Sequence, residues 1–239
     1  MPEIPEQTQT RNFPPQSAKD YTSVIYDGVY YPEEREDDMG ETSIHAKLIN
    51  KLLAMLLHFF DGRDDVFATT NMNLYFEKGN PRRWYAPDLL VAFGVPNVER
   101  SSYLLWREKV FPQVIVEIAS DKTWRNDVDE KLRTYEKWGA EEYYVLDSEF
   151  AYLSSPLMAF QRQEEKLVEQ EVVDDRIFSP RLNLEIVRTE NTFRLFNPNT
   201  NEFLLTMEEL EEKRRQIELE AKLEIERLKA EIERLKSQK

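Results

Sequence analysis

The chain has 239 residues, a hydrophobic content of 41% and a net charge of −14, which is typical of one compact domain with an appendage. The longest apolar run, residues 52–60, is far shorter than the roughly 20 residues that span a bilayer, so we expect no membrane contact. The absence of cysteine excludes disulfides and thiolate metal sites and fits a reducing compartment, so we expect a cytoplasmic protein. The acidic charge argues against a broad non-specific grip on nucleic acid.

The N-terminal part contains little sequence that favours a core. Residues 1–19 are rich in Pro, Gln, Thr and Glu, a composition typical of disorder. Residues 21–31 carry strand-forming side chains around Asp27-Gly28, which predicts a hairpin. We expect the folded domain to span residues 20–205.

Residues 44–60 carry apolar side chains at helical spacing and predict an amphipathic helix. Thr42 or Ser43 is a candidate N-cap. Glu41 and His45 lie four residues apart at its start. They form either a solvated first turn or a pair that reaches a functional site.

Residues 66–77 predict two short strands that close at 78–81. Arg82-Arg83 then stands beside Trp84-Tyr85. The arginines and rings either contact a phosphate backbone and its bases or form a surface turn with two buried rings, and we favour the turn.

Two carboxylates mark the next two predicted strands. Asp88 follows Pro87 at the start of the apolar run 88–93, and Glu117 lies inside the run 114–119. An unpaired buried carboxylate costs several kcal/mol, so Glu117 must be paired, bind a metal or lie at an exposed strand end. The long connection 94–111 either covers a cleft or packs as a lobe.

Residues 124–138 predict a helix that Ser120 or Thr123 caps and Gly139 ends. Asp127, Lys131 and Tyr135 are neighbours on it by i, i+4 spacing. Alone, an Asp–Lys pair of this kind contributes a few tenths of a kcal/mol. Beside two strand carboxylates, it suggests an oxygen-rich site that suits Mg²⁺ or Mn²⁺.

The combined order of motifs resembles the PD-(D/E)xK nuclease superfamily and, more closely, the Uma-type family of restriction endonucleases. The motifs that carry this resemblance are Pro87-Asp88, Glu117-Ile118-Ala119-Ser120, Asp127/Lys131/Tyr135 and Gly139/Glu142-Tyr143/Asp147. The resemblance covers residues 20–205. It implies metal-dependent hydrolysis of phosphodiester bonds in DNA, with Mg²⁺ or Mn²⁺ as the cofactor.

The resemblance also implies roles for individual residues. Asp88, Glu117 and the backbone carbonyl of Ile118 are expected to hold the metal, which activates water and neutralises phosphate charge. Lys131 is expected to orient the nucleophile and stabilise developing negative charge. Asp127 is expected to position Lys131 or a second metal-bound water.

Two further points concern the same site. Glu41 matches an acid that helices at this position carry in the family, and Tyr135 is expected to pack or hydrogen-bond behind the site. The superfamily pattern places a lysine two residues after the strand acid, where this chain has Ala119. Lys131 is its expected stand-in.

The remaining sequence predicts strands and then a charged helix. Residues 142–147, 157–162, 167–173, 182–187 and 193–196 predict strands, with the later ones extending the sheet as antiparallel hairpins. A last hairpin is expected over 195–205. Residues 206–239 hold no Gly or Pro and repeat every seven residues, which predicts either a single charged helix or a short coiled coil forming a homodimer through residues 221–236.

The sequence thus predicts an α/β fold: a mixed central sheet flanked by helices, with a C-terminal helical coiled-coil tail. The predicted function is a metal-dependent endodeoxyribonuclease. One alternative is a catalytically degenerate nuclease fold that acts as a scaffold through its tail, which the acidic charge and Ala119 favour. Another is a hydrolase that acts on a nucleotide or on a nucleic acid other than duplex DNA.

Overall fold

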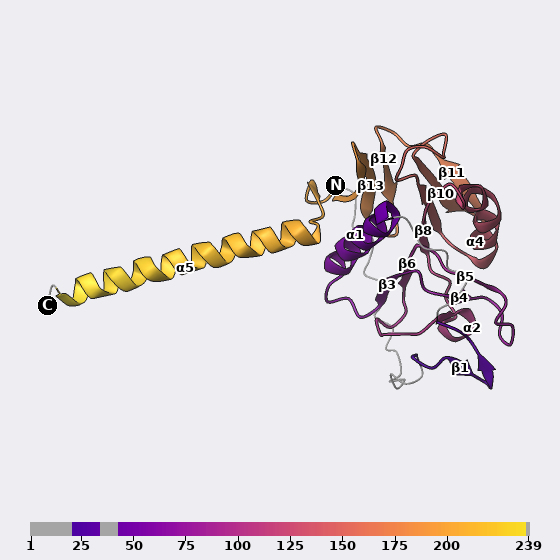
Figure 1. Ribbon diagram of the computed structural model, residues 1–239, viewed down its shortest axis with the longest axis horizontal. Coiled ribbons are helices and arrows are strands. Elements are labelled where there is room, and N and C mark those ends of the chain that lie inside the picture. Colours follow the sequence, from indigo (N-terminus) through magenta and orange to yellow (C-terminus); the bar gives the residue numbers. More distant parts are fainter. Residues whose placement is uncertain (1–20, 34–42, 238–239) are drawn as a thin grey trace.

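The computed structural model describes residues 21–33 and 43–237, which form a mixed α/β domain from which one long helix projects (Figure 1). The helical elements are α1 (Ser43–Phe59), α2 (Leu105–Glu108), α3 (Trp124–Asn126), the π-helical turn η2 (Asp127–Lys131), α4 (Leu132–Trp138) and α5 (Met207–Ser237). The expected disordered segment 1–19, Thr42 and Glu41 lie outside the described residues.

The strands belong to four sheets, and their bounds are as follows. They are β1 (Ile25–Tyr26), β2 (Val29–Tyr30), β3 (Val66–Thr70), β4 (Leu74–Tyr75), β5 (Trp84–Tyr85), β6 (Leu89–Phe93), β7 (Tyr103–Leu104), β8 (Val114–Ile118), β9 (Glu142–Leu146), β10 (Leu157–Gln163), β11 (Lys166–Gln170), β12 (Arg176–Ser179), β13 (Leu184–Thr189), β14 (Thr192–Asn197) and β15 (Glu202–Phe203).

The central sheet has six strands in the order β11-β10-β9-β8-β6-β3. All neighbouring pairs are antiparallel except β8 and β9, which are parallel. A parallel pair needs a crossover connection, and the helical run α3–η2–α4 supplies it. The mixed central sheet flanked by helices is therefore confirmed.

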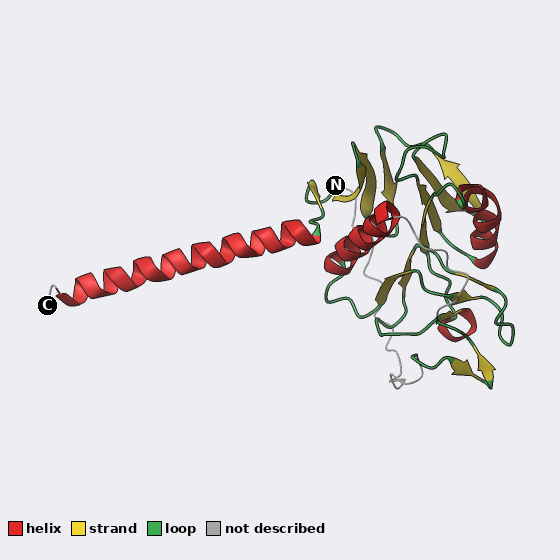
Figure 2. Cartoon of the chain, in the orientation of Figure 1, coloured by secondary structure: helices red, strands yellow, loops and turns green. Residues whose placement is uncertain are grey.

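Alternation along β8 divides the core into two layers. Val114, Val116 and Ile118 pack with the apolar face of α1, whereas Ile115 lies on the opposite face with Tyr135 of α4. Since successive side chains of a strand point to opposite faces, Glu117 shares the face that packs against α4. Figure 2 shows these helices flanking the sheet.

The late strands correct one expectation. β10 and β11 extend the central sheet, but β12–β15 form a separate four-stranded antiparallel sheet. Its apolar side chains, among them Ile186 and Phe193, join the core cluster around α1. Alternating polarity predicts strands and hairpins but does not specify which sheet edge they join. Here, apolar side chains of β13 and β14 pack in the same core cluster as the apolar face of α1.

The connection 94–111 packs as a lobe. It contains β7 and α2, and β7 pairs in parallel with β4 in the small sheet β5-β4-β7. The Arg100 side chain is fully buried, its guanidinium stacks on the Phe67 ring at 3.8 Å, and its Nε lies 3.4 Å from Glu108 Oε1. These contacts agree with the interpretation of this segment as a packed lobe.

The two ends of the described chain agree with their predicted secondary structure. β1 and β2 form the expected hairpin, with Asp27 (φ 49°) and Gly28 (φ 77°) in the left-handed region that such tight turns require. α5 is a single helix with no buried residue. Within the described ranges, no helix is both long enough and apolar enough to cross a membrane. The coiled coil stays a prediction.

Candidate active site

The site begins where the ladder between β6 and β8 ends. Leu89 pairs with Val116, so the next residues, Asp88 and Glu117, are cross-strand neighbours. The backbone N–H of Asp88 donates to Glu117 Oε2 at 3.3 Å, and the N–H of Ile118 donates to Asp88 Oδ2 at 2.6 Å. The Asp88 carboxylate thus continues the ladder beyond the last backbone pair, and this bond fixes its orientation.

The crossover helix brings a lysine and a third carboxylate to the same face. Lys131 Nζ lies 3.0 Å from Glu117 Oε2 and 2.8 Å from Asp127 Oδ1. Asp127 and Lys131 bound the π-helical turn η2. Turns of this kind are rare and frequently occur at functional sites. The i, i+4 pair was predicted from spacing, but its contact with Glu117 and the π-helical turn were not.

Two buried tyrosines hold these groups from behind. Tyr135 Oη donates a 2.6 Å hydrogen bond to Glu117 Oε1. Tyr143 Oη donates a 2.8 Å bond to the backbone carbonyl of Asp127. Both rings are fully buried, so strand and helix are locked together by interactions that leave Glu117 little freedom to move. The expected bond from Tyr135 is confirmed.

α1 contributes a histidine from the other layer. His45 Nε2 lies 3.1 Å from Asp88 Oδ2, and both side chains are mostly buried. His45 had two interpretations, a solvated first turn or a pair that reaches a functional site, and its side chain lies against Asp88. The sequence signals for it were its spacing from Glu41 and its match to a position in the resembled family, and Glu41 itself lies outside the described residues.

Burial dominates the electrostatics of Glu117. Its side chain is completely buried, and this loss of solvent raises the pKa of Glu117 to about 8, against the opposing effect of the Lys131 ammonium. The charges of Asp88 and Asp127 raise it further. Burial likewise raises the pKa of Asp127, with Lys131 again opposing. The site therefore crowds carboxylates in a region that disfavours negative charge.

At Lys131 the site favours the charged form of the side chain, whereas at Glu117 it favours the neutral form. Burial acts to lower the pKa of Lys131, but the carboxylates of Glu117, Asp127 and Asp88 outweigh it and raise that pKa above its usual value. Burial, followed by the charge of Glu117, raises the pKa of Tyr135. Lys131 is therefore a positively charged donor and Tyr135 a neutral one.

A divalent cation has an incomplete ligand set among the described residues, since these contain no cluster of three or more His, Cys, Asp or Glu side chains suited to a metal. The reason is visible in the ion pairs: the Lys131 ammonium lies between Glu117 and Asp127. Asp88, Glu117 and the carbonyl of Ile118 still offer the oxygen donors that Mg²⁺ prefers, and Mg²⁺ commonly uses only one or two protein carboxylates with water. These residues therefore fit a hard cation that retains several waters.

Two other motif residues have structural contacts away from this cluster. Glu142 is buried, and its carboxylate accepts bonds from the Ser179 and Tyr144 hydroxyls and from the N–H of Arg181. It ties the central sheet to the segment that leads into β13. The contacts with Ser179 and Arg181 could not be predicted from local patterns, because these two partners lie far along the chain.

Asp147 organises the loop that follows β9. Its fully buried carboxylate accepts backbone N–H bonds from Glu149, Ala151, Tyr152 and Leu153, at 2.6–3.2 Å. This motif residue therefore has a structural contact: its carboxylate satisfies backbone N–H groups of the loop.

The arginine–aromatic segment has the geometry of a surface turn. Arg82 and Arg83 are exposed, whereas Trp84 and Tyr85 are partly buried. Tyr85 Oη donates a 2.7 Å bond to Glu130 of η2. The rings thus pack against the domain, as the favoured interpretation expected.

Comparisons with known proteins identify the family of the chain. No curated protein matches the chain. One solved structure that matches is the crystal structure of "a putative nuclease belonging to DUF820" from Anabaena variabilis ATCC 29413, with 12% identity, a TM-score of 0.46, and coverage of 66% of this chain and 81% of that one. The model of the family described as "Uma2: Putative restriction endonuclease" matches residues 30–194. This match covers more than half of the chain and includes Asp88, Glu117, Ile118, Asp127 and Lys131, and the chain therefore belongs to the Uma2 family.

Proposed function

We propose that the protein is a metal-dependent endonuclease that hydrolyses phosphodiester bonds in DNA. The observation that carries this proposal is the charge balance of the buried cluster. Three carboxylates, Asp88, Glu117 and Asp127, converge there, and Lys131 supplies one permanent positive charge. His45 adds another only when it is protonated. Without a metal, burial favours the protonated form of Glu117 near neutral pH; a divalent cation would favour its ionised form and offset the negative charge of the three carboxylates.

Mg²⁺ or Mn²⁺ would be held by Asp88, Glu117 and the backbone carbonyl of Ile118. The ion would supply a more acidic bound water and neutralise charge on the scissile phosphate. Asp88 suits this task because the N–H of Ile118 and His45 both contact its Oδ2, which restricts the carboxylate to one orientation. Glu117 is restricted in the same way by Tyr135.

Lys131 would act on the phosphate and the attacking water. Its ammonium has three donors, and two of them are directed at Glu117 and Asp127. The third would donate to an anionic substrate oxygen, where a positioned cation stabilises charge that develops in the transition state. Asp127 would position Lys131, and Tyr135 would position Glu117.

A cleavage assay tests the proposal. The wild type would be incubated with plasmid and single-stranded DNA in the presence of Mg²⁺ or Mn²⁺, beside Asp88→Asn, Glu117→Gln and Lys131→Met. We expect metal-dependent cleavage that each substitution reduces by about 100-fold or more. A matched control is Asp129→Asn, an exposed carboxylate in the same π-helical turn, which should cleave at the wild-type rate.

The outcomes separate the proposed roles. Wild-type cleavage by a folded Asp88→Asn or Glu117→Gln variant would contradict the metal-ligand roles. Loss in the carboxylate variants with full activity in Lys131→Met would leave the lysine without a role in the reaction. Cleavage of single-stranded DNA but not of the plasmid would indicate that the substrate is single-stranded rather than duplex DNA.

An interaction module on a degenerate nuclease fold is the second candidate. The observations that favour it are Ala119 at the usual lysine position and the net charge of −14. Calorimetry with Mg²⁺ and Mn²⁺, with and without DNA, distinguishes the two. Heat of metal binding that disappears in Glu117→Gln supports the nuclease, and no binding by the wild type under either condition supports the interaction module.

A further inference from the structure

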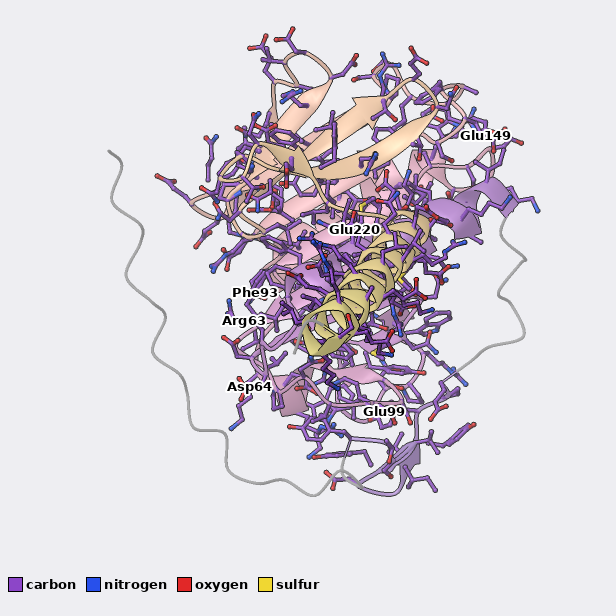
Figure 3. All side chains as sticks on the ribbon, turned by 90° about the vertical axis from the view of Figure 1, so that its left-hand side faces the viewer. Arg63, Asp64, Phe93, Glu99, Glu149 and Glu220 are labelled. Carbon is purple, nitrogen blue, oxygen red and sulfur yellow. The ribbon has the colours of Figure 1, made fainter. Side chains whose placement is uncertain are left out.

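The long helix α5 carries an apolar stripe that its own chain does not cover. Figure 1 shows α5 extending away from the domain, and Figure 3 looks along it, with side chains on all sides and Glu220 labelled. Six apolar residues follow one another at steps of three or four: Ile217, Ala221, Ile225, Leu228, Ile232 and Leu235. At 3.6 residues per turn they lie within an arc of roughly 80°.

This stripe is not buried by any other part of the described chain. Its five large side chains are 47–58% exposed, and α5 has no buried residue. The helix meets the domain only near its start, where Arg194 Nη2 lies 2.7 Å from Glu209 Oε2. A helix of this length in water gains most of its stability from packing an apolar face, so the stripe requires a partner.

We propose that this partner is a second copy of the same chain, bound in a parallel and in-register coiled coil. In the heptad that fits the repeat, Ile225 and Ile232 are at position a, and Ala221, Leu228 and Leu235 are at position d. Isoleucine at a with leucine at d favours parallel two-stranded coiled coils. The proposal is independent of the nuclease function.

The flanking charges select both the partner and its orientation. Between residues 221 and 236, both g positions are glutamate (Glu224 and Glu231) and all three e positions are lysine (Lys222, Lys229 and Lys236). In a parallel pair each g residue faces the e residue of the following heptad, so Glu224 meets Lys229 of the partner subunit. An antiparallel pair places g against g and e against e, where like charges repel. The same sequence therefore attracts its copy in one orientation and repels it in the other.

Ion pairs within one helix explain only part of this pattern. Arg227 lies 3.3 Å from Glu224, and Arg214 lies 3.1 Å from Glu218. Exposed pairs of this kind contribute at most about 1 kcal/mol, and they do not require that all e positions carry one sign and all g positions the other. A dimer does.

The seam continues toward the domain with one irregularity. The steps from Ile217 to Ala221 and from Ala221 to Ile225 are both four residues, which locally unwinds a coiled coil as a stutter does. The apolar contact thus extends from Ile217 to Leu235. Parallel helices would bring both domains to the same end of the assembly, since each domain precedes its helix.

Light scattering on the full chain tests the association. The wild type should have twice the chain mass of 28.5 kDa. Ile225→Asp combined with Ile232→Asp should return the mass to that of one chain without altering the melting of the domain. The matched control combines Leu219→Asp with Leu223→Asp, since these two residues are equally exposed but lie off the stripe, and it should remain dimeric.

Cross-linking tests the orientation. Because the chain has no cysteine, Arg214→Cys and Leu235→Cys each introduce a single thiol near opposite ends of the stripe. After the two variants are co-refolded and oxidised, a parallel dimer yields 214–214 and 235–235 disulfides. A 214–235 product would overturn the parallel orientation. A monomeric wild type, or a dimer that survives Ile225→Asp with Ile232→Asp, would overturn the proposal.

Discussion

Lys131 Nζ lies 3.0 Å from Glu117 Oε2 and thereby joins the crossover helix to the central strand. This contact brings together two residues whose local patterns are unrelated: a carboxylate on a buried strand and a lysine in a π-helical turn. The single positive charge of Lys131 balances only part of the negative charge of the three carboxylates. The same charged groups therefore affect the stability of the fold, the proposed binding of a metal and the proposed reaction. The following predictions separate these effects.

Glu117→Gln should change how stability depends on pH. The unfolded carboxyl titrates near 4.5, whereas burial raises the folded pKa to about 8. The folded state therefore takes up a proton, so this group's stabilisation is complete below pH 4.5 and is lost as pH rises toward 8. Without divalent ions, the free energy of unfolding of Glu117→Gln should therefore increase relative to that of the wild type as pH rises through this window, by on the order of 1 kcal/mol per pH unit.

Thermal melting at pH 6 and pH 8.5 measures this difference. Glu164→Gln, which removes an exposed carboxylate, is the control and should follow the wild type at both values. If the melting temperatures of Glu117→Gln and the wild type differ by the same amount at both pH values, the carboxyl does not take up a proton on folding.

Lys131→Met should make the fold depend on a divalent cation. Removing the ammonium leaves Asp127 and Glu117 buried without their shared counter-charge, and breaking a buried ion pair costs about 3–5 kcal/mol. Mg²⁺ or Mn²⁺ should then raise the melting temperature of the variant more than that of the wild type. Lys122→Met, an exposed lysine in the turn before α3, should show the wild-type response to metal, and an equal response in Lys131→Met would contradict the charge argument.

Tyr135→Phe should weaken the domain through Glu117. The substitution keeps the buried ring but removes the 2.6 Å hydrogen bond to Glu117 Oε1. An unsatisfied buried carboxylate oxygen costs about 1–3 kcal/mol, which urea unfolding can resolve. Tyr152→Phe removes an exposed hydroxyl that donates to Glu149 and should lie within about 0.5 kcal/mol of wild type. Equal stabilities for the two variants would mean that the Tyr135 bond contributes no net stability.

Asp147→Ala should destabilise the fold and leave the site's metal affinity intact. The substitution strips four backbone N–H groups of their acceptor, for an expected loss of about 2–4 kcal/mol. Glu149→Ala, in the same loop and labelled in Figure 3, removes an exposed carboxylate and should have little effect. Calorimetry of the folded Asp147→Ala variant should give the wild-type metal affinity, and a selective loss of metal binding would instead place Asp147 in the site.

Local patterns predicted most of the secondary structure. The helical spacing of residues 44–60 predicted α1 (Ser43–Phe59), and the apolar run 114–119 predicted β8 (Val114–Ile118). Gly139 ends α4 with φ 103°, as its lack of a side chain allows. These features depend on neighbours within one or two turns, so the sequence contains them directly.

Local sequence patterns thus predicted the three longer helical segments, most of the strands, the heptad of α5 and the presence of a carboxylate within a buried strand, but not the short helix α2 or the π-helical turn η2. Tertiary structure decided which groups meet: His45 with Asp88, Lys131 with Glu117, and Glu142 with Ser179. It also assigned β12–β15 to a second sheet. The physical reason is that periodicity fixes the direction of a side chain relative to its own element, whereas contacts between elements depend on how their apolar surfaces pack.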